Sequence, residues 1–154
     1  MAVEVPTSRP PLFPRWALNT QIFLLRRNWI KPLNKNLMVL TLAGRKTGKV
    51  YSIPITYVRD GKDVLVFTLS NGRNWYKNVQ VKPDVTLEVM GEKIHAQAKV
   101  VDMNDKTAVL AVMKVYQRRF PRRLSSYFGV AANADEDGLL KVQGNAWFVR
   151  FRPV

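Results

Sequence analysis

A short run of small and basic residues, Gly44-Arg45-Lys46-Thr47-Gly48-Lys49, joins two strand-like segments of the chain. The two glycines allow backbone N–H groups to converge on an anion, while the basic side chains add positive charge and Thr47 adds a hydroxyl donor. The run is not a Walker loop, because its glycines stand closer together than those of a P-loop and a strand follows it. It therefore indicates a phosphate-type loop, or else a tight hairpin turn with solvated basic side chains.

A second group of polar, basic and aromatic residues spans Ser70 to Asn78, where a strand-like run passes into a helical one. Such a junction presents the free N–H groups of a helix N-terminus to an anionic or carbonyl-bearing ligand. The two large aromatic residues there, Trp75 and Tyr76, can instead serve as anchors of a hydrophobic core. The local pattern leaves both interpretations open.

Several kinds of catalytic chemistry are excluded by what the chain lacks. Its 154 residues include no Cys and a single His, His95, which excludes thiolate catalysis, Cys-ligated zinc and any site with several His ligands. The acids Asp84, Glu88 and Glu92 are scattered, and no close pair of carboxylates suggests a hydrolase of the two-carboxylate type. We therefore predict no metal site and no triad.

Positive charge dominates the composition. The chain has 25 Lys and Arg against 11 Asp and Glu, a formal net charge of +14, and residues 1–60 hold most of the excess. Nucleic acid, anionic lipid and an anionic cofactor would all be attracted by such a field. Arg118, Arg119, Arg122 and Arg123 form a separate basic cluster, which either guides an anion or is a solvated helix end.

Runs of apolar and β-branched residues predict six strands, at residues 37–42, 50–58, 64–69, 85–89, 94–101 and 146–151. Turns at Asp60-Gly61 and Gly91-Glu92 fold them into antiparallel hairpins. Helical spacing marks residues 74–81 and 105–120, with Asn104 or Asp105 as a cap, whereas 121–144 has no clear period and is expected to be an irregular loop. The order is typical of a small β-barrel decorated by helices.

The N-terminal region is predicted to be an extended arm followed by a basic amphipathic helix. Residues 1–14 contain four prolines, and from Arg15 to Ile30 apolar residues recur at helical spacing until Pro32 stops the helix. This gives an arm at 1–14, a helix unit at 15–32 and a barrel domain at 33–154. The helix either packs on the barrel or, through residues 15–31, lies on an anionic membrane surface.

The combination of motifs is more specific than any one of them. Leu40-Thr-Leu-Ala-Gly-Arg-Lys-Thr-Gly-Lys, a strand with a proline, Asp-Gly, Ser70-Asn-Gly, Asn74-Trp-Tyr-Lys-Asn78 and Pro83-Asp-Val follow one another. Across residues 37–101 this order resembles the deazaflavin-dependent nitroreductase family. The resemblance implies a mainly β (α+β) split β-barrel of about six antiparallel strands, with an N-terminal helix and one or two further helices. It also implies binding of coenzyme F420, which carries a phosphate and an oligoglutamate tail.

The same resemblance implies an oxidoreductase that passes hydride from the reduced coenzyme to a quinone, nitroaromatic or other activated small-molecule acceptor. Because the hydride comes from the coenzyme, such a protein needs only binding, orientation and electrostatics. By this resemblance, Tyr57 and Ser70 match positions that in other members of the family lie near the deazaflavin ring and the acceptor. We expect one of their hydroxyls to hydrogen-bond the acceptor oxygen. The expected cofactor contacts are Gly44, Arg45, Lys46, Thr47, Gly48, Lys49, Tyr51, Ser52, Ile53, Pro54, Ile55, Asn71, Arg73, Trp75, Tyr76 and Asn78, with Arg45, Lys46, Lys49 and Arg73 on the tail.

Other cofactors and classes of function remain as alternatives. Split barrels also bind FMN and haem, because a fold does not fix its ligand. A non-enzymatic basic module on anionic membrane or nucleic acid is the rival class, and nucleic acid is disfavoured because no nucleic-acid motif accompanies the charge. The longest apolar run, Ala108 to Met113, is too short to span a bilayer, and the N-terminus does not read as a signal peptide. We expect a cytoplasmic protein, with the inner face of the cell membrane as a second location and a homodimer allowed.

Overall fold

The computed structural model describes residues 15–27 and 35–154. The predicted arm at 1–14 and the last part of the predicted N-terminal helix lie outside these residues. Within them, helix α1 spans Arg15–Arg26, and Arg27 already lies in a turn. No helix of this part of the chain is long and apolar enough to cross a bilayer.

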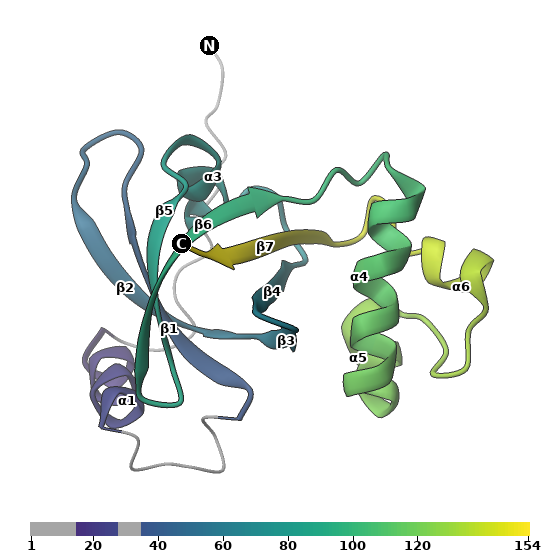
Figure 1. Cartoon of the computed structure of the whole chain (residues 1–154), viewed down its shortest axis with the longest axis horizontal. Helices are drawn as coiled ribbons and strands as arrows, with labels where there is room; N and C mark the ends of the chain where they lie inside the picture. The colour runs from purple at the N-terminus through teal and green to yellow at the C-terminus, as the bar shows by residue number, and fades with distance from the viewer. Residues whose placement is uncertain (1–14, 28–34) are drawn as a thin grey trace.

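All seven strands of the described residues belong to one sheet, in the order β2-β1-β5-β6-β7-β4-β3 (Figure 1). Every neighbouring pair is antiparallel. The strands are β1 Leu37–Ala43, β2 Val50–Thr56, β3 Val58–Asp60, β4 Asp63–Thr68, β5 Asp84–Val89, β6 Glu92–Val100 and β7 Trp147–Pro153. The mainly β fold and its antiparallel hairpins, including the turn at Asp60-Gly61, are confirmed.

A single residue, Tyr57, connects the two edges of the sheet. Strand β2 pairs with β1 up to Thr56, whereas β3 pairs with β4 from Val58 onward. Because the chain changes partners at this point, the predicted single strand at 50–58 is wrong and is two strands with a corner between them. The N–H of Tyr57 donates instead to the carbonyl of Asn36, at 3.0 Å. The sheet consequently wraps around into a half-barrel.

The sheet separates two hydrophobic cores. Inside the barrel, residues such as Met38, Leu87 and Val149 pack with helix α3, Asn74–Val81, which lies at the position predicted for it. On the outer face, Phe148 packs with residues of the C-terminal helices. These helices form a lobe at the side of the barrel (Figure 1). Successive residues of one strand point to opposite faces, so Phe148 and Val149 serve different cores.

The helical lobe contains more regular structure than its sequence indicated. Helix α4 spans Lys106–Arg119, and its predicted cap Asp105 accepts hydrogen bonds from two backbone N–H groups of the first turn. The expected irregular loop at 121–144 is wrong in part, since it holds a 3-10 turn (Pro121–Arg123) and the short helices α5 (Leu124–Phe128) and α6 (Glu136–Leu140). Helices of five residues are too short to produce a recognisable apolar period.

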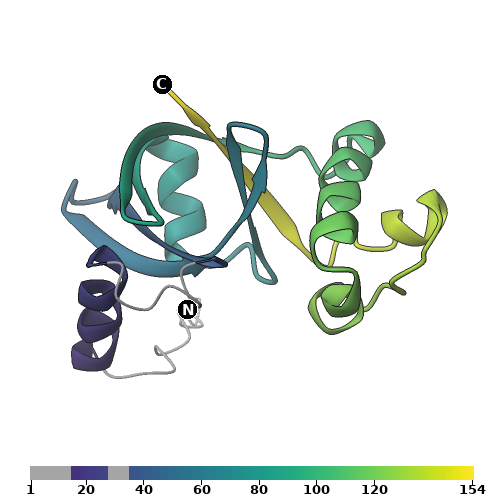
Figure 2. The same cartoon turned by 60° about the horizontal axis from the view of Figure 1, so that its bottom comes forward.

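Helix α1 packs on the outer face of β1 and β2, below the barrel in Figure 2. Its buried Ile22 and Leu25 contact Val39 of β1. The opposite side of the helix leaves Trp16 and Phe23 with 72% and 48% of their surface exposed. The helix therefore packs on the barrel, as one of the two sequence-based interpretations predicted, and still presents aromatic rings to solvent.

Candidate functional site

The loop from Gly44 to Lys49 connects β1 to β2 and is closed by its own hydrogen bonds. The Gly44 N–H donates to the Lys49 carbonyl and the Gly48 N–H donates to the Gly44 carbonyl, both at 2.9 Å. The Lys49 N–H donates to Thr47 Oγ1 at 3.2 Å. Gly48 has φ +71°, a conformation that L side chains rarely adopt. The loop is thus a tight hairpin turn, and its shape is fixed before any ligand arrives.

Helix α3 holds this loop through one buried side chain, Asn78. Its Oδ1 accepts from the backbone N–H of Arg45 at 3.1 Å and from Arg45 Nη1 at 2.7 Å. Its Nδ2 donates to the Tyr51 hydroxyl at 2.7 Å. Asn78 has only 4% of its surface exposed, so these bonds form in a site of low dielectric, where hydrogen bonds are strong.

A cleft of about 370 Å³ opens between the loop and the helix. It is lined by Gly44, Arg45, Lys46, Thr47, Tyr51, Asn74 and Asn78. In the described part of the chain, no hydrogen bond occupies the backbone N–H of Lys46 or Thr47. Two free N–H donors beside basic side chains are the donor set that binds a phosphate or carboxylate. The structure therefore brings together the two motifs that the sequence places thirty residues apart.

Strand β2 divides the remaining expected contacts between its two faces. Tyr51, Ile53 and Ile55 pack toward the barrel interior. Ser52 lies on the other face, where its Oγ is 2.7 Å from Thr41 Oγ1 and accepts from Arg26 Nη2 of helix α1 at 3.2 Å. Pro54 shares that outer face by the two-residue period of the strand. The structure thus does not bring Ser52 and Pro54 to the cleft.

The turn after β4 carries the next group of expected site residues. The Ser70 N–H donates to Thr68 Oγ1, and Ser70 Oγ accepts from the Gly72 N–H at 3.3 Å. Asn71 and Arg73 are exposed, and the side chain of Arg73, the N-cap residue of α3, makes no hydrogen bond to the first turn of that helix. Trp75 is partly buried, whereas Tyr76 is an anchor of the barrel core, so its core interpretation is confirmed.

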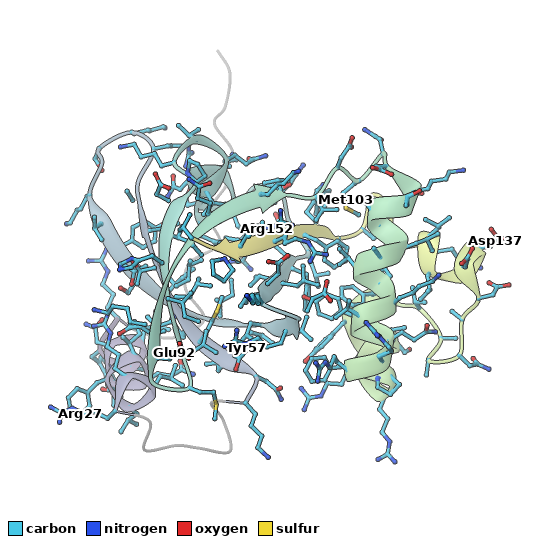
Figure 3. All side chains as sticks on the ribbon, in the orientation of Figure 1. Arg27, Tyr57, Glu92, Met103, Asp137 and Arg152 are labelled. Carbon is cyan, nitrogen blue, oxygen red and sulfur yellow. The ribbon has the colours of Figure 1, made fainter. Side chains whose placement is uncertain are left out.

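Tyr57 lies at a different place from Ser70. It is 4% exposed and borders a cleft of about 240 Å³ with Asn36, Arg59 and Phe120. Figure 3 shows it on the side of the barrel that faces the helical lobe. Burial raises the pKa of its phenol, although the positive charge of Arg59 lowers it, and the net shift is upward. The hydroxyl is therefore a neutral hydrogen-bond donor at pH 7.

Comparison with known families assigns the chain. Residues 26–125, well over half of the chain, match the family model described as F420H(2)-dependent quinone reductase. The chain belongs to this family. It is accordingly an F420-dependent oxidoreductase, as the motifs of the loop and of helix α3 suggested.

Solved structures with a similar fold accompany this match. The structure of an F420-H2 dependent reductase (FDR-A) has a TM-score of 0.52 and 15% identity, covering 76% of this chain and 94% of that one. The haem storage protein HutZ of Vibrio cholerae has a TM-score of 0.54 and 15% identity, covering 89% and 90%. General Stress Protein 26 of Bacillus anthracis has a TM-score of 0.50 and 13% identity, covering 84% and 89%. At such identities the likeness shows a shared split-barrel fold.

One basic residue beside the loop was not expected from the sequence. Lys82 follows helix α3, and its Nζ lies beside Gly48, 3.3 Å from where a Cβ on that glycine would stand. It is four residues after Asn78, and residues at this spacing share a helix face. That spacing was the signal that could have identified it.

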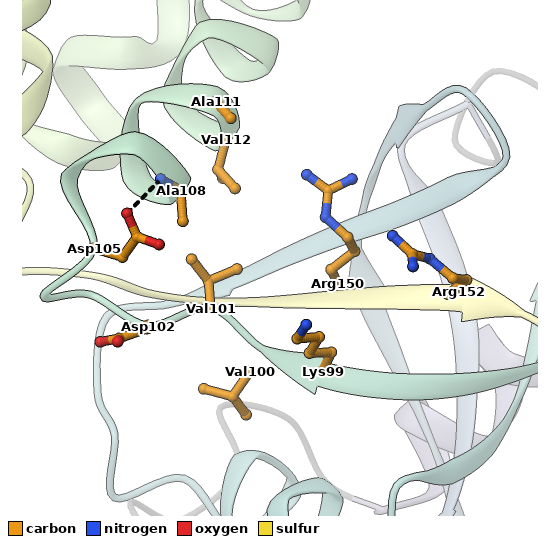
Figure 4. Close-up of a pocket in the computed structure, with 10 residues that line it drawn as sticks. All are labelled: Lys99, Val100, Val101, Asp102, Asp105, Ala108, Ala111, Val112, Arg150 and Arg152. Carbon is orange, nitrogen blue, oxygen red and sulfur yellow. Dashed lines mark hydrogen bonds between the residues drawn. The ribbon is translucent and has the colours of Figure 1, made fainter.

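A further cleft of the reductase, of about 340 Å³, lies between β6, β7 and α4 (Figure 4). Several charged side chains of this cleft already have partners within the protein. Arg150 Nη1 donates to Asp60 at 2.8 Å and to Asp63 at 3.0 Å, and Asp105 caps α4. Burial lowers the pKa of the Arg150 guanidinium, but its hydrogen bonds to the two carboxylates and their charges raise it above its ordinary value. This cleft contains none of the expected site residues.

Proposed function

We propose that this reductase transfers hydride from reduced F420 to a quinone, nitroaromatic or similarly activated acceptor, with the Gly44–Lys49 loop as the anchor of the coenzyme phosphate and tail. The observation that carries the proposal is the cleft beside this loop, where Asn78 holds Arg45 and the backbone N–H groups of Lys46 and Thr47 have no hydrogen-bond partner among the described residues. Such a set suits a ligand with a phosphate and several carboxylates.

Arg45 is the best-placed cation for this anchor. Asn78 engages its backbone N–H and one guanidinium nitrogen, which leaves the other donors of the fork for a carboxylate. Lys46 and Lys49 are exposed on the loop, and Lys82 adds a further ammonium. Because Arg45 is held in place before binding, little side-chain entropy is lost when it meets the ligand.

The deazaflavin ring is proposed to lie along β2. This strand is an edge of the sheet, and an edge strand offers unpaired backbone donors and acceptors to a flat heterocycle. Tyr51, Ile53 and Ile55 line its inner face, and Trp75 stands on the neighbouring helix. The bound coenzyme supplies the hydride. The chain contributes orientation, exclusion of water and a hydroxyl donor from Tyr57 or Ser70 for the acceptor oxygen.

Steady-state kinetics with reduced F420 and a panel of acceptors test this assignment of roles. Arg45→Ala should mainly raise KM for the coenzyme, because it removes binding, whereas Tyr57→Phe should mainly lower kcat. Arg122→Ala, which removes a cation of the basic cluster outside the proposed coenzyme site, is the control. The opposite pattern of KM and kcat would refute the two roles.

FMN and haem remain the alternative ligands, since proteins of this fold differ in what they bind. Titration of the purified protein should show binding of F420 in the micromolar range or tighter, with FMN much weaker. The reverse order would overturn the choice of coenzyme. A homodimer stays a proposal that light scattering tests.

Helix α1 supports a second proposal, a peripheral contact with an anionic membrane. Its exposed Trp16 and Phe23 lie near Arg15 and Arg27, and the Arg27 guanidinium lies over the Phe23 ring. Exposed aromatic rings with neighbouring bases are typical of helices that bind at a lipid interface. This contact would bring a lipid-soluble acceptor such as a quinone close to the enzyme.

A further inference from the structure

The cleft beside Tyr57 is built from three parts of the chain that are distant in sequence. Lys35 and Asn36 precede β1, Arg59 follows the β2–β3 corner, and Arg119 and Phe120 end helix α4. The volume of about 240 Å³ suits a small ring or an acid group rather than a large cofactor. The cleft stands at the far end of β2 from the Gly44–Lys49 loop.

Three cations line this cleft, and no acid does so among the described residues. Among the described residues four basic side chains form ion pairs, for example Arg26 with Glu88 and Arg150 with Asp63. Within residues 15–27 and 35–154, no ion pair or hydrogen bond joins the side chain of Lys35, Arg59 or Arg119 to another residue. Their charges therefore add up at the cleft without compensation.

The three cations of the cleft come from different elements of the fold. Arg119 lies in the last turn of α4, where the helix dipole favours a positive charge. Lys35 and Arg59 come from other elements and line the same cleft. Phe120, partly buried, and Tyr57 add aromatic surface to the same cleft. Together they make a small pocket with aromatic walls and a positive rim.

We propose that the cleft lined by Tyr57, Arg59 and Arg119 is an anion-binding subsite that holds the acid group of an aromatic acceptor. The proposal rests on the function proposed above and names the class of acceptor: a quinone or nitroaromatic that carries a carboxylate, sulfonate or phosphate. Charge-assisted hydrogen bonds from the cations fix the acid group, and the ring lies against Phe120 and Tyr57. The Tyr57 hydroxyl then stands near the oxygen that is being reduced.

A matched pair of acceptors tests this specificity. 1,4-Naphthoquinone-2-sulfonate carries the acid, and 2-methyl-1,4-naphthoquinone does not; each gains a hydride and a proton to become the hydroquinone while F420H2 is oxidised to F420. Arg59→Ala and Arg119→Ala should each lower kcat/KM for the sulfonate about tenfold, the loss of one charged hydrogen bond. Activity with the methyl compound and KM for F420H2 should stay within about twofold, a change too small to represent a lost hydrogen bond.

Arg118→Ala is the control, because Arg118 neighbours Arg119 on the same helix and does not line the cleft. Equal losses with Arg118→Ala, or equal losses for both acceptors, would overturn the subsite.

Calorimetric titration with naphthalene-2-sulfonate, which accepts no hydride, separates this proposal from the function. If naphthalene-2-sulfonate binds and Arg59→Ala and Arg119→Ala weaken this binding, the subsite is supported. If in addition neither quinone is reduced, only the proposed function is refuted. Binding that the two variants leave unchanged refutes the subsite.

Discussion

The side-chain oxygen of Asn78 accepts hydrogen bonds from both the backbone N–H and the guanidinium of Arg45, at 3.1 and 2.7 Å. Through its nitrogen the same side chain donates to the Tyr51 hydroxyl. A helix, a loop and a strand are therefore fixed by one buried amide. The cleft beside the loop depends on that amide for its shape.

Asn78→Ala should weaken both the fold and coenzyme binding. It removes both hydrogen bonds that Arg45 makes to Asn78 and leaves the Tyr51 hydroxyl without that donor, which costs about 1–3 kcal/mol for a buried unsatisfied group. Urea denaturation should show this loss of unfolding free energy, and KM for F420H2 should rise in the same variant. Gln80→Ala, exposed on the same helix, is the control and should change neither quantity. An unchanged KM in a destabilised variant would separate Asn78 from coenzyme binding.

Gly48→Ala should impair the loop more than an equivalent change elsewhere. The backbone of Gly48 has φ +71°, which strains a residue with a side chain, and an added Cβ would lie 3.3 Å from Lys82 Nζ. Gly61 has a similar φ of +60° with nothing within 4 Å of the added Cβ, so Gly61→Ala carries the backbone strain alone. Both variants should lose about 1 kcal/mol of stability. Only Gly48→Ala should also raise KM for F420H2, and a rise in both would mean that the kinetic effect is general.

Tyr116→Phe should leave the stability unchanged or raise it by up to about 1 kcal/mol. Tyr116 is a fully buried residue of α4 in an aromatic cluster with Phe67, Phe128 and Phe148, and its hydroxyl has no hydrogen-bond partner in the described structure. Removing the hydroxyl keeps the ring contacts and abolishes the cost of an unsatisfied buried group. Urea denaturation measures the difference. A loss of more than about 1 kcal/mol would show that the hydroxyl is satisfied in solution.

Alkaline pH should destabilise the protein through its buried tyrosines. Burial raises the pKa of Tyr51, Tyr57, Tyr76 and Tyr116 above the ordinary 10.0, most strongly for Tyr116. Above that value the unfolded chain loses phenolic protons that the folded chain retains, so the free energy of unfolding falls as pH rises. Denaturation at a series of pH values should show the fall, and Tyr116→Phe should make it shallower. Parallel curves for the two proteins would contradict the assignment to Tyr116.

Replacement of Trp16 and Phe23 by Ala should reduce binding to anionic vesicles about tenfold or more, because each ring buries apolar surface at a lipid interface. Co-sedimentation with phosphatidylglycerol vesicles measures the effect. Point substitutions are preferable to deletion of the helix, since Ile22 and Leu25 cover β1 and Arg26 pairs with Glu88. Asn19→Ala, exposed on α1, is the control. Equal sedimentation of the double variant and the parent protein would exclude α1 as the contact.

Local patterns predicted much of the fold. Asp60-Gly61 indicated a hairpin, and Asp105 stood where a helix cap was needed, because both signals act within a few residues. The partner change at Tyr57 was invisible, since it depends on pairing with β1 and β4 rather than on local residue preference. Side chains alternate between the two faces of a strand, so the sequence of β2 already implies that Ser52 and Tyr51 lie on opposite faces.

The centre of the candidate site was only partly foreseeable. The Gly44–Lys49 loop and the α3 motif were both identified from sequence, and the resemblance linked them. The bonds from Asn78 to Arg45 and Tyr51 cross 33 and 27 positions of the chain, and no spacing rule reports a contact of that range. The cleft with Arg59 and Arg119 could not be predicted for the same reason, because three segments that are distant in sequence meet there only after folding.

Adjacent residues of β7, Phe148 and Val149, belong to separate cores, so one sheet acts as a partition between two interiors. The helical lobe packs on one side of this sheet and α3 packs on the other. Arg119 and Phe120 sit on the lobe, and the phosphate-type loop sits on the barrel. With the acceptor subsite and the coenzyme loop assigned as proposed above, we expect that substitutions in the lobe can change which acceptors are reduced without altering the coenzyme loop.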